Sequence, residues 1–84
     1  IYIKKNDIVI LISSSGMSKN IIEAAKYCKT KKIPLISLSG FSKKNNLNRY
    51  GKFKFHVNSN NYNVVETCHL IILLNIVENL LKSK

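Results

Sequence analysis

The sequence predicts an α/β fold built on a parallel sheet, with the element order strand, helix, strand, strand, helix. Residues 7–13 and 34–40 are apolar runs rich in β-branched side chains, which predict buried strands. Between these runs, and again after residue 63, apolar side chains recur every three or four positions, which predicts helices. A strand, a helix and a second strand in succession are typical of a parallel sheet.

The first strand is a continuous apolar run over residues 7–13, a pattern typical of a central strand that is covered on both faces. A turn of small residues, 13–18, follows this strand. Helical spacing then extends from Ser18 to about Thr30, and we expect Ser18 to cap the helix.

The second strand covers residues 34–40, because Pro34 excludes a continuing helix. Residues 41–51 are polar and rich in Lys and Asn, and we expect a connection with one helical turn near Leu47. Residues 53–57 alternate apolar and polar side chains, which predicts a half-exposed strand near the edge of the sheet.

The last helix is predicted to begin at Asn63, which forms a capping-box pattern with Glu66, and to extend to Leu81. Residues 70–77 are apolar almost all round the helix. The other predicted elements cannot cover such a helix on every side, so we expect further chain or a second subunit to do so. Because this run is far shorter than the roughly 20 residues that cross a bilayer, no membrane contact is expected.

The length of 84 residues allows one small domain at most, and 45% apolar residues indicate a globular chain. The chain begins with Ile1 rather than Met and enters its first strand almost at once, so we expect a piece of a longer polypeptide. Cys28 and Cys68 have no second cysteine nearby, and we expect buried thiols in a reducing, cytoplasmic location rather than a disulfide or zinc framework.

The formal net charge of +10 raises the question of nucleic-acid binding. Every basic residue except Arg49 is a lysine, and the lysines are spread among Asn and Ile residues. Neither arginine forks nor aromatic stacking platforms form a legible pattern. The composition therefore favours a lysine-rich surface over a nucleic-acid partner, which stays the weakest of three functional alternatives.

The turn over residues 13–18 is the strongest candidate site. It places Ser13, Ser14, Ser15 and Ser18 between the end of a buried strand and the start of a helix. Ligands of open α/β sheets bind beyond the carboxyl ends of strands, and the N–H groups at a helix N-terminus favour phosphate. The sequence therefore predicts an anion site, with a ligand-free serine cap as the alternative.

Residues 7–20, DIVILISSSGMSKN, resemble the signature of the sugar isomerase (SIS) domain family, in which a strand leads into a Ser-rich loop and a helix. Residues 33–40, IPLISLSG, are similar to the next strand of the family, and residues 64–69, VVETCH, resemble the start of its last helix in the phosphoheptose isomerase branch. The resemblance implies a Rossmann-like three-layer α/β/α fold. It also implies that residues 1–84 are the C-terminal portion of a single SIS domain, a partial β-α-β-β-α unit.

The resemblance assigns roles to several residues. It implies that the serine side chains of the turn hold the phosphate of a sugar phosphate, with Ser14 acting through its side chain or its backbone N–H. It also implies that Glu66 and His69 lie near the sugar as candidate catalytic groups. It also implies a cytoplasmic homo-oligomer and possible zinc in the intact enzyme. The isomerases carry a further metal-binding histidine where this chain has Leu74. From the residues alone, Glu66 could instead cap its helix and His69 could simply be packed.

Three functions follow from these patterns. The first is part of an aldose-ketose isomerase that acts on a phosphosugar such as sedoheptulose 7-phosphate, in the synthesis of surface-carbohydrate precursors. The second is a non-catalytic SIS module that senses sugar phosphates or scaffolds a protein partner. The third is a basic nucleic-acid-associated protein. Whichever applies to the intact protein, we expect the isolated chain to be inactive, because the family draws its catalytic glutamate from an earlier half of the domain.

Overall fold

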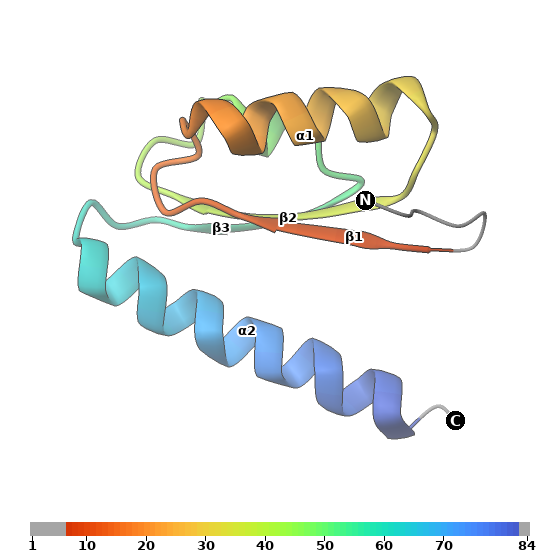
Figure 1. The fold of residues 1–84 in the computed structure, drawn as a ribbon. Helices are drawn as coiled ribbons and strands as arrows, with labels where there is room; N and C mark the ends of the chain where they lie inside the picture. The colour runs from red at the N-terminus through yellow and green to blue at the C-terminus, as the bar shows by residue number, and fades with distance from the viewer. Residues whose placement is uncertain (1–6, 83–84) are drawn as a thin grey trace.

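The computed structural model describes residues 7–82 and confirms the predicted order of elements. Figure 1 shows a sheet with one helix on each face, so the three-layer α/β/α fold is also confirmed. The elements are β1 (Val9–Ile12), α1 (Lys19–Thr30), β2 (Leu35–Gly40), the 3-10 turn η1 (Leu47–Arg49), β3 (Phe53–Val57) and α2 (Tyr62–Lys82).

The sheet is parallel throughout, with the strand order β1-β2-β3. Among the described strands β2 is therefore central and β1 lies at an edge, so the prediction of a central first strand is wrong for this part of the chain. A continuous apolar run indicates that both faces of a strand are buried. It does not indicate whether another strand pairs with each of its two edges. In agreement with the prediction, β3 lies at the other edge with three of its five residues exposed.

The main core lies between the sheet and α1. Ala25 and Cys28 of α1 pack with Leu35 of β2 and Leu47 of η1, and all four are buried. The predicted helical turn near Leu47 thus supplies a core residue from an otherwise polar connection. Burial of these apolar side chains fixes α1 on one face of the sheet.

On the opposite face, α2 contacts the sheet mainly through its first half. Val65 and His69 are buried, whereas Leu70, Leu74 and Leu81 are more than half exposed. Figure 1 shows α2 diverging from the sheet toward its C-terminal end. The described part of the chain therefore leaves an apolar helix face uncovered, as the sequence predicted.

By length and composition α2 would also pass as a membrane-spanning helix, with a mean hydropathy of 1.6 over its most apolar 18 residues. The 70–77 run thus understates the length of this apolar stretch, and the expectation of no membrane contact stays a prediction. The helix carries apolar residues on both sides of the 70–77 run, which extends the stretch. Its buried Val65 and His69 show that part of this apolar surface packs against the sheet.

The start of α2 also differs from the prediction. The helix begins at Tyr62, and the Asn61 side-chain oxygen accepts a hydrogen bond from the Val64 N–H at 3.2 Å. Asn61 is thus the N-cap, and Asn63 lies inside the first turn. Residues 58–63 hold several Asn side chains of the type that caps helices, so the sequence pattern alone did not distinguish among them.

Candidate functional site at the carboxyl ends of the strands

The predicted serine turn lies at the carboxyl edge of the sheet. β1 ends at Ile12, opposite Leu38 of β2, and the Ser13 N–H donates to the Leu38 carbonyl at 3.0 Å. α1 then begins at Lys19, with Ser18 in the N-cap position as predicted. Parallel strands place all their carboxyl ends at this edge, so the turn lies where open α/β sheets bind ligands.

Gly16 gives the turn its shape. Its φ of 68° is left-handed, a conformation that glycine adopts without steric cost. A Cβ at this position would also overlap the side-chain amide of Asn45. The turn is therefore tightly packed against the connection that follows β2, and only glycine fits.

The four candidate serines have different environments. Ser13 Oγ accepts a hydrogen bond from the Gly16 N–H at 3.1 Å, and Ser15 Oγ accepts one from the Met17 N–H at 3.2 Å. Each of these hydroxyls keeps its own proton for a further acceptor. Within the described residues the Ser18 side chain forms no capping bond, contrary to expectation, so it leaves the first-turn N–H groups of α1 uncapped.

Ser14 lies closest to α2. A Cβ on Gly40, at the end of β2, would lie 2.8 Å from the Ser14 carbonyl oxygen and 2.6 Å from Val65 Cγ1. The absence of a side chain at Gly40 therefore lets the serine turn and α2 approach each other across the end of β2. This contact brings the two predicted groups of site residues together.

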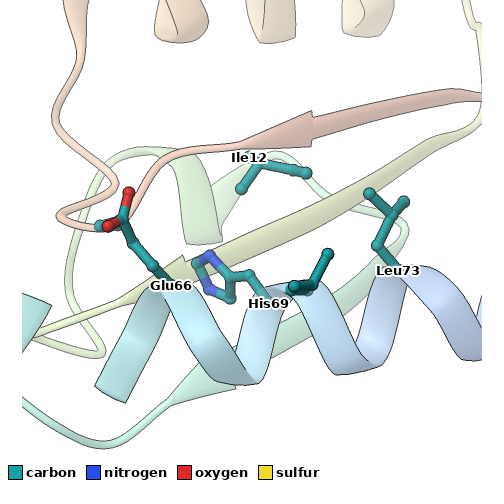
Figure 2. A pocket seen from close by; sticks show the side chains of 6 residues that line it. Ile12, Glu66, His69 and Leu73 are labelled. Atoms are coloured by element: carbon teal, nitrogen blue, oxygen red, sulfur yellow. The ribbon is translucent and has the colours of Figure 1, made fainter. Parts of the chain in front are cut away.

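A pocket of about 200 Å³ lies between β1, the serine turn and α2. It is lined by Ile12, Ser14, Glu66, His69, Leu70 and Leu73. Figure 2 shows Glu66 and His69 extending from α2 toward the end of β1, with Ile12 and Leu73 as apolar wall. The structure thus unites Ser14, Glu66 and His69, whereas Ser13, Ser15 and Ser18 are not among the described residues that line this pocket.

His69 is buried and hydrogen-bonded. The residue is 3% exposed, and Nε2 lies 2.8 Å from the Ser39 carbonyl oxygen. Nδ1 is buried and has no hydrogen-bond partner within residues 7–82. Glu66, one turn earlier on α2, is exposed. The expected packed histidine is therefore found, but one of its nitrogen atoms is left unused by the packing.

Two residues that the sequence reading overlooked support the site. Buried Asn45 donates through Nδ2 to Ser39 Oγ, to the Gly40 carbonyl and to the Ser42 carbonyl, at 3.1, 3.1 and 2.7 Å. Ser39 thus binds Asn45 through its side chain and His69 through its carbonyl. An asparagine within a Lys/Asn-rich connection gives no sequence signal for such a role, because its partners come from the end of β2.

The pocket supplies few donors for the zinc that the resemblance implies. Glu66 and His69 supply two candidate ligands at one pocket, and a catalytic zinc site takes about three from protein. No group of three His, Cys, Asp or Glu side chains is found in the described chain. Leu74, at the position of the family's histidine, is 58% exposed and has no ligating atom. These residues alone therefore do not fit a complete zinc site.

Comparisons with known proteins agree with this geometry. Thirty-eight residues are 55% identical to phosphoheptose isomerase 2 of Campylobacter jejuni subsp. jejuni serotype O:2, covering 45% of this chain and 19% of that protein. The structure of a phosphoheptose isomerase from Francisella tularensis superposes with a TM-score of 0.77 at 27% identity, over 87% of this chain and 39% of that one.

The chain thus spans less than half of the length of either relative. The family model of the SIS domain matches residues 1–77, which is most of the chain. Together with the parallel sheet and the serine turn before α1, this match shows that the chain belongs to the SIS domain family.

Proposed function

We propose that this chain binds a sugar phosphate, with the phosphoryl group at the serine turn and the sugar against α2. The observation that carries the proposal is the shared pocket of Ser14, Glu66 and His69, groups more than 50 positions apart in the sequence. Ser14 belongs to the turn that leads into α1 at Lys19, and the N–H groups and dipole at a helix N-terminus favour an anion. The names of both relatives indicate a phosphoheptose-type ligand such as sedoheptulose 7-phosphate.

We also propose that residues 1–84 are the C-terminal portion of a single SIS domain. The pocket volume of about 200 Å³ is below the range of about 300–1,000 Å³ that is typical of ligand sites. A second wall from further chain would enlarge and close it. The exposed apolar face of α2 supports the same proposal, because such a face needs cover.

For the intact protein we propose a cytoplasmic, homo-oligomeric phosphosugar isomerase. Isomerisation needs a base beside the carbonyl, an acid or metal on its oxygen, and an anchor for the phosphate. Here the serine turn is the anchor, and Glu66 is the exposed carboxylate nearest to it in the pocket. Zinc, if the enzyme uses it, would need ligands from outside the described residues.

A non-catalytic module that senses sugar phosphates is the second candidate. Leu74 favours it, because leucine at the family's histidine position can neither bind metal nor transfer a proton. The two candidates differ in turnover: an isomerase interconverts the ketose and aldose phosphates, which ¹H NMR follows directly. Binding of sedoheptulose 7-phosphate by the full polypeptide without any interconversion would select the module.

Replacement of Ser14 by Ala tests the binding site itself. Loss of a hydrogen bond to a charged group costs about 1–3 kcal/mol, so we expect affinity for sedoheptulose 7-phosphate to fall about 5- to 150-fold in calorimetry on the full polypeptide. Thr30→Ala is the matched control, since Thr30 is exposed at the far end of α1. Equal affinities for wild type and Ser14→Ala would exclude this pocket as the sugar-phosphate site.

A further inference from the structure

We propose that the chain carries a second anion site, for a small organic phosphate, at the amino ends of the strands. A pocket of about 240 Å³ lies there and is lined by Lys29, Lys32 and Lys52. Figure 1 shows the turn from α1 into β2 at the end of the sheet opposite the serine turn. The two pockets share no lining residue, so this site does not depend on the proposed sugar-phosphate site.

The positive charge of this pocket comes from three segments of the chain. Lys29 lies in the last turn of α1, Lys32 in the turn that follows it, and Lys52 directly before β3. The Lys32 N–H donates to the Lys29 carbonyl at 3.2 Å, and the Lys52 N–H donates to the Leu35 carbonyl of β2 at 2.8 Å. A lysine near a helix C-terminus complements the helix dipole, which accounts for Lys29 but not for Lys52.

The pocket itself supplies no negative charge. No acidic side chain is among the described residues that line it. The exposed ion pairs Glu23–Lys26 and Glu78–Lys82 involve none of its three lysines. Like charges around one pocket repel one another, and an anion between them offsets that repulsion. Charge complementarity therefore favours a ligand with more than one negative charge.

The wall between the lysines is apolar, which favours an organic anion. It consists of Ile33, Pro34, Leu35 and the ring of Tyr50. Tyr50 packs against the α1 core, and Lys29 Nζ lies 5.8 Å from its ring centroid. An apolar surface beside cationic groups suits a ligand whose carbon part and phosphoryl group make different contacts. The small volume suits one compact ligand, whereas a nucleic-acid strand binds along an extended basic groove.

Two matched pairs of lysines test the site in the full polypeptide. Lys32→Gln removes a charge from the lining, and Lys31→Gln removes the same charge one position away, outside the described lining. Lys52→Gln and Lys54→Gln form the second pair in the same way. All four lysines are exposed, so these variants should fold. The pairs are made in the Ser14→Ala background, so that binding at the serine turn is weakened in every sample.

Calorimetry with phenyl phosphate compares the members of each pair. We expect Lys32→Gln and Lys52→Gln each to lower the affinity about fivefold, and Lys31→Gln and Lys54→Gln to change it by less than about twofold. Inorganic phosphate should bind less tightly than phenyl phosphate, because it cannot contact the apolar wall. Equal effects within each pair would overturn the inference, since they would show that only net charge attracts the anion. Equal affinities for the two anions, or no binding of phenyl phosphate, would also overturn it.

Duplex DNA tests the alternative that these lysines contact a nucleic acid. At an ionic strength of about 0.15 M, which screens exposed charges, we expect DNA not to displace phenyl phosphate. Displacement by DNA that weakens alike in all four lysine variants would show a general basic surface instead of a site, and would overturn the inference.

Discussion

At the scale of single residues, the site depends on Gly40 as much as on the side chains that line the pocket. Its missing side chain lets the Ser14 backbone and Val65 approach the end of β2 closely. Ser39, one residue earlier, supplies the carbonyl that orients His69. The last two residues of β2 therefore position groups from both the serine turn and α2.

Gly40→Ala is expected to separate the serine turn from α2. The added methyl group would lie 2.6 Å from Val65 Cγ1, and such overpacking costs about 1–3 kcal/mol of unfolding free energy. Denaturant unfolding measures that cost. Val65→Ala in the same chain makes room for the methyl group, so the double variant should lose less stability than the sum of the two single changes. Strict additivity would contradict the close approach.

The two cysteines differ in burial, so the expectation of two buried thiols is correct for Cys28 and wrong for Cys68. Cys28 is 2% exposed in the α1 core, whereas Cys68 is half-buried on α2. Burial raises the pKa of the Cys28 thiol above its ordinary value of 9.0. The thiol at Cys28 is therefore inert in the folded chain.

We expect an alkylating reagent to modify Cys68 much faster than Cys28, which mass spectrometry of peptide fragments can follow over time. Equal rates of alkylation would contradict the burial of Cys28.

The raised pKa of Cys28 also predicts how the unfolding free energy changes with pH. Below pH 9.0 both the folded and the unfolded thiol are protonated; above it the unfolded thiol ionises first, so unfolding free energy should fall as pH rises. Cys28→Ala should remove that part of the decline.

At the scale of elements, the start of α2 shows which of the neighbouring Asn residues caps the helix. Asn61 caps the helix with its side chain, and its carbonyl accepts the Val65 N–H at 3.0 Å. Val65 and His69 are four positions apart on one helix face, and both are buried. The cap bonds therefore hold the first turn of the helix that carries His69 into the pocket wall.

Asn61→Ala should lower the unfolding free energy by about 1 kcal/mol, the typical cost of losing an N-cap. Asn63→Ala is the matched control, because Asn63 is exposed within the first turn and alanine favours helix. Thermal unfolding by circular dichroism compares the two. A larger loss for Asn63→Ala would show that Asn63 is the N-cap, as the capping-box pattern predicted.

At the scale of the whole molecule, the apolar face of α2 is the main unbalanced feature. Among the described residues it exposes Leu70, Ile71, Leu74, Val77 and Leu81. In the intact protein, the proposed remainder of the SIS domain would cover this face. The alternative is that a second subunit covers it. The same cover would supply the missing wall of the pocket.

Leu74→Lys tests for that cover in the full polypeptide. A charge placed on a buried face should destabilise the protein by well over about 0.5 kcal/mol, the usual range for exposed positions. Asn79→Lys, an exposed polar position on the same helix, serves as the control and should change little. Equal, small effects in denaturant unfolding would show that solvent reaches this face in the intact protein.

The sequence by itself determined the order of elements, the parallel α/β class, the serine turn before α1 and the uncovered last helix. Local patterns of apolar spacing, small residues and proline predict each of these features. The family resemblance added Glu66 and His69 to the candidate site, and the assigned roles of these residues and of the four serines remain predictions.

Only the tertiary structure decided that Ser14 meets Glu66 and His69 in one pocket, that Asn61 caps α2, and that β2 rather than β1 is central among the described strands. It also placed His69 Nε2 at hydrogen-bond distance from the Ser39 carbonyl, with no partner for Nδ1 among residues 7–82. The physical reason is that these properties depend on partners distant in sequence. The periodicity of one segment indicates which of its faces is apolar and needs to be buried. Which residues from other segments bury that face is decided only by the contacts of the folded chain.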